Sequence, residues 1–271
     1  MADVMKMATR ESYGKALVEA GKQNPDFVVL DADLAAATKT GTFKKEFPNR
    51  FYDCGIAEGN MMSIAAGIAA TGKRVFASTF AMFAAGRAFE QVRNSIGYPH
   101  LPVIIGATHA GISVGEDGAT HQCCEDIALM RTIPGMVVMC PSDDVEAKAA
   151  VRAALEYEGP VYIRFGRAAV PVINDRPEYH FEIGKGDVVK EGKDVTIVAT
   201  GICVDSALGA AELLKAEGID AEVVNICTIK PLDEELIVKS AKKTGKVVTV
   251  EEHSVIGGLG SAVCDALCKS Y

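Results

Sequence analysis

The chain has 271 residues, 49% apolar and 24% charged, with a formal net charge of −8; this composition is typical of globular proteins and excludes a disordered chain. The negative charge argues against nucleic acid as a partner, because phosphate backbones are bound by clustered lysine and arginine. No apolar run approaches the roughly 20 residues that cross a bilayer, and the N-terminus is too polar for a signal peptide, so we expect a cytoplasmic protein without membrane contact.

The first part of the chain alternates short apolar runs with alanine-rich helical stretches. The runs that we expect to be strands are residues 27–30, 75–80, 103–109, 136–140 and 161–165. Continuous apolar runs without polar alternation are typical of parallel strands that are covered on both faces. Helices between such strands make a βαβ assembly. We therefore expect an α/β fold, with a first parallel-sheet domain over residues 1–171.

The alternation of apolar runs and helical stretches stops after this domain and then resumes. Residues 172–193 are rich in turn-forming residues and are expected to be a linker with one or two edge strands. Residues 194–271 are expected to form a second, smaller α/β domain with strands near 195–201, 221–226 and 247–250. Because these strands are fewer than most sheets have, we expect this domain to be truncated at its C-terminus or completed by a partner.

Glu58 stands at the start of a helix that is apolar almost all round and therefore buried. Glutamate is rarely buried without a partner. One interpretation is a carboxylate in the first helical turn, stabilised by the helix dipole. The other is a carboxyl group held in an apolar site so that it exchanges a proton with a ligand nitrogen.

Two histidines, His109 and His121, lie in a glycine-rich loop that follows an apolar run. Open α/β sheets bind ligands at the carboxyl ends of their strands, so a site is expected here. A metal site is disfavoured, because the histidines have neither helical spacing nor cysteine partners, and a solvated turn is a further alternative. The pattern favours acid–base and hydrogen-bonding work on a polar substrate.

Three further side chains close to predicted strand ends have two interpretations each. Phe80 and Phe83, three residues apart, are typical of core packing but also suit stacking on a ligand ring. Arg164 follows apolar residues at the end of a predicted strand. It suits a phosphate or carboxylate ligand, or structural pairing with an acidic neighbour.

Taken together, these segments resemble the C-terminal half of transketolase, in the form in which that enzyme is split over two chains. The motifs that carry the resemblance occur in the family's order: G-I-A-E at 55–58, S-T-F at 78–80, G-E-D-G-A-T-H-Q at 115–122 and E-E-H-S-V-I-G-G-L-G at 251–260. The loop motif is the most specific of them. The resemblance implies a pyrimidine-binding domain followed by the family's C-terminal domain.

The resemblance implies thiamine diphosphate as the cofactor. In such enzymes the glutamate at the position of Glu58 bonds to a ring nitrogen of the aminopyrimidine, which then removes the thiazolium C2 proton. Phe80 and Phe83 match the aromatic wall against the pyrimidine, and Asp33 matches an aspartate near the cofactor. The implied reaction is the transfer of a two-carbon ketol unit from a ketose phosphate such as xylulose 5-phosphate to an aldose phosphate, as in the pentose phosphate pathway.

The resemblance also assigns substrate contacts. His109, His121 and Asp117 match residues that bind substrate hydroxyls and assist proton transfer. Arg164 and Arg10 match arginines that grip the sugar phosphate. An alanine and a glycine follow His109 where many one-chain transketolases carry aspartate and serine, so donor contacts are expected to differ.

A partner chain is expected, because the family's diphosphate and metal motif, G-D-G followed by a spaced asparagine, does not occur in this sequence. The resemblance therefore implies that an N-terminal transketolase subunit holds the diphosphate and its Mg²⁺ or Ca²⁺, while this chain provides no metal ligand. Two copies of each chain would form a heterotetramer. The alternatives are a subunit resembling 1-deoxyxylulose-5-phosphate synthase, the beta subunit of a 2-oxoacid dehydrogenase, and a catalytically silent scaffold subunit.

Overall fold

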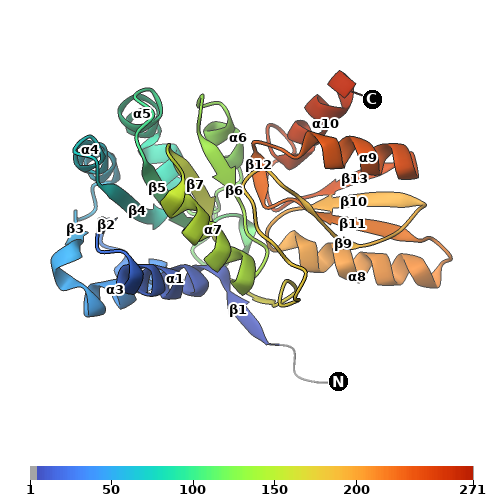
Figure 1. Cartoon of the computed structure of the whole chain (residues 1–271), viewed down its shortest axis with the longest axis horizontal. Helices are drawn as coiled ribbons and strands as arrows, with labels where there is room; N and C mark the ends of the chain where they lie inside the picture. Colours follow the sequence, from blue (N-terminus) through green and yellow to red (C-terminus); the bar gives the residue numbers. More distant parts are fainter. Residues whose placement is uncertain (1–4, 271) are drawn as a thin grey trace.

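The computed structural model of the protein describes residues 5–270. Two helix-covered sheets lie side by side in this part of the chain (Figure 1). The larger has the order β12-β6-β7-β5-β4-β2-β3, and all its strands except β12 run parallel. Its strands are β2 (Phe27–Asp31), β3 (Phe51–Asp53), β4 (Arg74–Phe80), β5 (Val103–Thr108), β6 (Val137–Met139), β7 (Val161–Arg164) and β12 (Thr228–Lys230). The expected α/β fold is confirmed.

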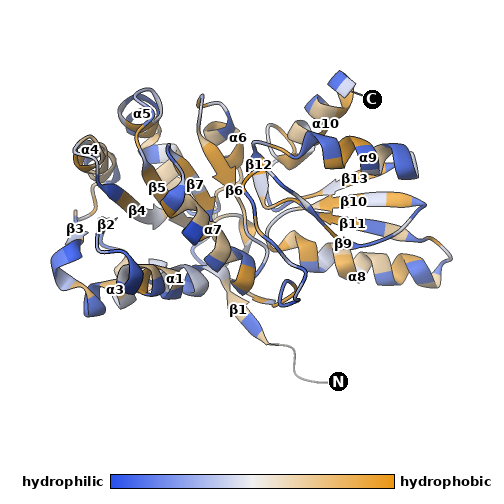
Figure 2. Cartoon of the chain, viewed as in Figure 1, coloured by the Kyte–Doolittle hydropathy of each residue, from blue (hydrophilic) through white to orange (hydrophobic). Residues whose placement is uncertain are grey.

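Helices cover both faces of the larger sheet, because its strands present apolar side chains on both sides. One face is covered by α1 (Thr9–Gln23), α3 (Gly41–Glu46) and α7 (Asp144–Glu156). The other is covered by α4 (Glu58–Ala69), α5 (Phe89–Gln91), the π-helical turns Phe83–Arg87 and Val92–Gly97, and α6 (Asp126–Arg131). Figure 2 shows β6 as hydrophobic along its length, whereas α9 mixes hydrophobic and hydrophilic residues.

The smaller sheet has the order β13-β10-β11-β9. Its parallel strands are β10 (Val195–Ala199), β11 (Ala221–Asn225) and β13 (Val247–Val250), which match the strands expected in this region. The helices around it are α8 (Cys203–Ala216), α9 (Glu234–Thr244) and α10 (Leu259–Ser270). The sheet has a fourth strand beyond the three expected, because β9 (Asp187–Lys190) pairs antiparallel with β11 at its edge; β9 lies in the segment 172–193, where one or two edge strands were expected.

The two sheets are joined more closely than the sequence indicated. Strand β12 comes from the second half of the chain but pairs antiparallel with β6 in the larger sheet. Near the N-terminus, β1 (Lys6–Ala8) pairs with β8 (Ala169–Pro171). One apolar cluster contains both Ile105 of β5 and Val198 of β10. The C-terminal region is therefore packed firmly against the larger sheet.

Candidate active site

The carboxyl ends of β2, β4 and β5 bring together several residues that the sequence singled out. These strands are parallel neighbours in the larger sheet. Phe80 is the last residue of β4, and His109 directly follows β5. Asp33 follows β2 by two residues. Ligands of open α/β sheets bind at this edge, so the candidate active site lies here.

An aromatic cluster links both candidate histidines. The ring of Phe80 stacks on His109 with 3.9 Å between centroids, and on Phe83 with 5.9 Å. His121 meets Phe83 nearly at right angles, with 5.3 Å between centroids. Phe80 is buried, whereas Phe83 is half-buried. Phe80 therefore packs between site residues, and Phe83 keeps part of its ring available for a ligand.

His109 is held in the neutral state with a defined tautomer. It is 3% exposed, and its pKa is lowered to about 4 by burial and then by the positive charge of Arg10. Arg10 Nη1 lies 3.0 Å from Nε2 of His109, and Thr108 Oγ1 lies 2.9 Å from Nδ1. Because arginine only donates, Nε2 accepts, and the proton of the neutral ring is on Nδ1, directed to Thr108.

Arg10 has a hydrogen-bond donor that is not used within the site. Its Nη1 also donates to the carbonyl of Ala37 at 3.0 Å. Its Nε is buried, and among the described residues it has no hydrogen-bond partner. Burial lowers the pKa of this guanidinium, although arginine stays charged near neutral pH. A half-buried cation with an unused donor suits an anionic group of a ligand.

Arg167 is a candidate that the sequence analysis missed. It stands three residues after Arg164, and its positive charge lowers the pKa of both His109 and Arg10. Its Nη1 donates to the carbonyl of Val114 at 2.6 Å, and its Nη2 donates to Glu116 at 3.1 Å. Glu116 is exposed, so this contact is easily exchanged for a ligand. The run of apolar residues that ends at Arg164 gave no signal for Arg167, which lies outside it.

Arg164 is buried among structural partners, and the structure favours the structural interpretation of this residue. The residue is 5% exposed, and its Nε donates to the buried carboxylate of Asp126 at 2.9 Å. Its Nη2 donates to the carbonyls of Cys123 and Glu252, at 3.2 and 2.7 Å. A guanidinium with these partners is not free for a sugar phosphate, so the expected phosphate contact of Arg164 is corrected.

Glu58 is buried and paired. It is the first residue of α4 and is 2% exposed. Its Oε2 accepts a hydrogen bond from Arg87 Nη1 at 3.0 Å. Arg87 also lies over the ring of Phe83, 4.6 Å from its centroid, at the end of the π-helical turn Phe83–Arg87. Glu58 thus opens the buried helix as both interpretations of the sequence require, but it also has a partner, Arg87, which connects it to the aromatic cluster.

The loop after β2 is organised by Asp31, which the sequence analysis did not single out. Asp31 is fully buried, and its carboxylate accepts hydrogen bonds from the Leu34 amide and from the hydroxyls of Thr38 and Thr40, at 2.6 to 2.8 Å. Burial raises the pKa of Asp31 to about 6. Asp33 is exposed in this loop with a φ of +61°. Asp31 therefore shapes the loop, including α2 (Ala35–Thr38), and Asp33 remains open to a partner.

The remaining candidates lie on the loop between β5 and α6. Asp117 is exposed, and its negative charge raises the pKa of His109, against the larger effect of burial. His121 is half-buried, with its Nδ1 2.9 Å from Thr120 Oγ1. The loop therefore places both residues near His109. In residues 5–270, no cluster of His, Cys, Asp and Glu is suited to a metal ion, and no helix could span a membrane.

The chain matches two domain families and several known proteins. Residues 5–172 match the family "Transketolase, pyrimidine binding domain", and residues 184–271 match "Transketolase, C-terminal domain". A "Putative transketolase C-terminal section" from Methanocaldococcus jannaschii is 55% identical, over 96% of this chain and 82% of its own length. A "6-deoxy-6-sulfo-D-fructose transketolase subunit" from Clostridium sp. (strain MSTE9) is 46% identical, over 95% of this chain and 80% of its own length.

A solved structure described as "Split gene transketolase, inactive beta4 tetramer" superposes with a TM-score of 0.91. It is 59% identical in sequence, and the match covers 98% of this chain and 87% of that one. The order and geometry of the two domains agree with these similarities, and the chain belongs to the transketolase family as the C-terminal section of a split-gene transketolase.

Proposed function

We propose that this subunit catalyses, together with an N-terminal partner subunit, the transfer of a two-carbon ketol unit between sugars that end in an anionic group. The observation that carries the proposal is the position of neutral His109 between the Arg10 guanidinium and the ring of Phe80. When the Arg10 guanidinium turns from Nε2 of His109 to the anionic end of a sugar, Nε2 of the neutral ring becomes free to accept a hydrogen bond or a proton from a sugar hydroxyl.

The residues at the site fit the aminopyrimidine of thiamine diphosphate. Glu58 provides a buried carboxylate, and Phe83 provides a partly exposed ring that Arg87 links to it. When bound, the cofactor supplies the carbon nucleophile that carries the two-carbon unit. Glu58 would hold a proton toward a ring nitrogen, with Arg87 giving up or sharing its contact, while Phe80, Phe83 and Asp33 would position the ring.

The rest of the cofactor is assigned to the partner. The N-terminal subunit would hold the diphosphate and its Mg²⁺ or Ca²⁺, and two copies of each chain would form a heterotetramer. Purified alone, this chain should therefore show no thiamine-diphosphate binding in a calorimetric titration. Tight binding by the lone subunit would contradict the two-chain proposal.

Substrate specificity would depend on Arg10 and Arg167 rather than on Arg164. Arg10 has an unused buried Nε, and Arg167 is held by an exposed glutamate that a ligand can displace. The Clostridium relative is named for a sugar with a sulfo group, and the oxygens of either a phosphate or a sulfonate can accept hydrogen bonds from two guanidinium groups. His121 and Asp117 would bind hydroxyls closer to the reacting carbons.

Substrate pairs with and without the anionic group test this proposal. In the complex with its N-terminal partner, Arg167→Ala should raise KM for xylulose 5-phosphate about 10- to 100-fold, the loss of one charged hydrogen bond. KM for an unphosphorylated ketose should stay within about twofold. Arg176→Ala, which removes an arginine paired with Asp187 elsewhere, is the matched control. Equal effects of Arg167→Ala on both substrates would reject the anion site.

A further inference from the structure

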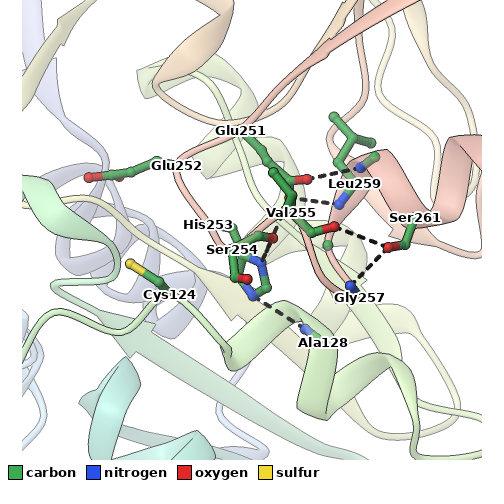
Figure 3. A network of polar contacts seen from close by, with 12 residues as sticks. Cys124, Ala128, Glu251, Glu252, His253, Ser254, Val255, Gly257, Leu259 and Ser261 are labelled. Atoms are coloured by element: carbon green, nitrogen blue, oxygen red, sulfur yellow. Dashed lines mark hydrogen bonds and ion pairs between the residues drawn. The ribbon is translucent and has the colours of Figure 1, made fainter.

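The connection between β13 and α10 reaches from the C-terminal domain to the candidate active site. It comprises residues 251–258 and begins with two consecutive glutamates. In Figure 3 their side chains point in opposite directions: Glu251 toward Leu259 at the start of α10, and Glu252 away from that helix. The two neighbouring carboxylates therefore serve different parts of the molecule.

Glu251 acts within its own domain. Its two carboxylate oxygens accept hydrogen bonds from the backbone amides of Leu259 and Gly260, at 2.6 and 2.9 Å. These amides belong to the first turn of α10, where they lack partners in the helix. A carboxylate at this position also interacts favourably with the helix dipole. Glu251 is therefore a helix cap without contact to the site.

Glu252 instead contacts the loop between β5 and α6. Its buried carboxylate accepts a hydrogen bond from the backbone amide of Ser113 at 2.5 Å. It also packs against Gly111, where an added Cβ would lie 2.2 Å from Cδ of Glu252. Gly111 has a φ of +78°, a conformation that side chains rarely adopt. Glu252 thus fits a loop shape that only glycine allows.

Arg164 ties Glu252 to the other end of the same loop. Its Nη2 donates to the Glu252 carbonyl at 2.7 Å and to the Cys123 carbonyl at 3.2 Å. The Cys123 carbonyl also accepts the amide of Gly111 at 2.9 Å. A closed set of hydrogen bonds therefore joins the start of the loop at Gly111, its end at Cys123, and Glu252 of the C-terminal domain.

The next two residues extend this contact toward α6. The amide of Ser254 donates to the Cys124 carbonyl at 2.8 Å. The buried imidazole of His253 accepts, through Nε2, the amide of Ala128 at 3.4 Å (Figure 3). Three consecutive residues of the C-terminal domain thus contact the segment 111–128. Between these contacts, residues 115–120 are mostly exposed and include two glycines, so they have little stiffness of their own.

We propose that Glu252 is a positioning residue that fixes the loop carrying Asp117 and His121, so that the C-terminal domain controls substrate binding without touching the substrate. This inference rests on the proposed function, because that function gives the loop its role. The hydrogen bond from the Ser113 amide to Glu252 fixes the start of the loop. Arg164, which donates to the Glu252 carbonyl, fixes the end of the loop relative to the C-terminal domain. Loss of the Glu252 carboxylate releases the start of the loop at Ser113, while the main-chain contacts at its end remain and Glu58 and His109 stay in place.

Hydrogen exchange in the isolated chain tests the contact independently of any activity. Glu252→Ala should increase amide exchange of residues 111–118 about tenfold or more, because the Ser113 amide loses its acceptor. Glu252→Gln keeps an acceptor oxygen and should restore most of the protection, which also guards against a variant that fails to fold. Glu251→Ala is the matched control and should increase exchange only at the start of α10. Unchanged exchange of the loop in Glu252→Ala would overturn the proposal.

Steady-state kinetics in the complex with the N-terminal subunit test the consequence. Glu252→Ala should raise KM for the sugar phosphate about tenfold, with a smaller change in kcat, and Glu252→Gln should rescue KM. Glu251→Ala should leave KM unchanged. A loop that loosens with no effect on KM would overturn the positioning role. A wild-type complex without ketol transfer, with the loop still loosened by Glu252→Ala, would refute the proposed function but not the contact.

Discussion

The two parallel-sheet regions of the molecule use similar polar residues at their strand ends in different ways. After β5, His109 faces aromatic rings and a half-buried guanidinium with an unused donor. After β13, His253 and Glu251 are satisfied by backbone groups of the helices around them. A glutamate and a histidine near a strand end therefore do not by themselves indicate catalysis. What distinguishes the site is the combination of a half-buried guanidinium, a neutral imidazole and a partly exposed aromatic ring at the same strand ends.

Two arginine–carboxylate pairs show the same difference between structural contacts and contacts at the candidate site. Arg164 and Asp126 are both buried, and further hydrogen bonds surround them. In the pair of Arg87 with Glu58, the carboxylate is buried but the arginine side chain is 53% exposed. A partner at the surface can be exchanged for a ligand, whereas a buried partner cannot. The first pair therefore supports the fold, whereas in the second pair the arginine lies at the surface and is free to move away from Glu58.

The largest effect is expected at Glu58. Glu58→Gln should reduce ketol transfer in the assembled complex by about 10²- to 10⁴-fold, because the amide cannot exchange a proton with the pyrimidine. Size-exclusion chromatography should show unchanged assembly. Glu251→Gln, the same change at a glutamate that caps α10, is the control. Turnover of Glu58→Gln close to that of the control would remove Glu58 from catalysis.

Arg164→Ala should be the most destabilising of the arginine variants. It leaves the buried Asp126 carboxylate without its cation, and breaking such a pair costs about 3–5 kcal/mol. Urea unfolding of the isolated chain measures this change. Arg167→Ala, at a partly exposed arginine, should cost less than about 0.5 kcal/mol. If Arg164→Ala lost as little stability as Arg167→Ala, Arg164 would not be a structural residue and would again be a candidate ligand contact.

His109 should give the chain a measurable pH dependence. Its folded-state pKa of about 4 lies below the ordinary histidine value of about 6.5, so the unfolded chain binds the proton first as the pH falls. The stability linked to His109 is therefore complete above about pH 6.5 and is lost toward pH 4. Between pH 7 and pH 5 the wild type should lose about 2 kcal/mol more than His109→Gln in urea unfolding. Parallel pH profiles of the two proteins would contradict this.

The fold was predictable where local patterns decide it. Apolar runs without alternation correctly indicated the parallel strands, and therefore which residues stand at strand ends, including Phe80 and His109. Strand β12 was missed because it has only three residues, and β9 was expected only as an unspecified edge strand in a segment rich in turn residues. Their pairing depends on partners far away in the sequence, which periodicity cannot reveal.

The site was predictable by residue type but not by contact. The motifs pointed to Glu58 and His109, and both lie near the aromatic cluster. The role of Arg164 depends on Asp126 and on Glu252, which are 38 and 88 residues away in the chain. No local pattern shows that these partners bury its guanidinium. For the same reason the sequence did not single out Arg167, whose relation to His109 is purely spatial.

A small effect is expected at Arg87, and it tests the contrast between the two pairs directly. Arg87→Gln should lower the free energy of unfolding by about 1 kcal/mol, because the removed charge belongs to a side chain that is 53% exposed and glutamine keeps a hydrogen-bond donor toward the buried Glu58 carboxylate. Urea unfolding beside Arg164→Ala, under identical conditions, measures the difference. If both variants lost the same stability, exposure of the arginine would not separate a replaceable partner from a structural one. Glu58 would then be as firmly committed within the chain as Asp126, and a cofactor nitrogen could not take the place of Arg87.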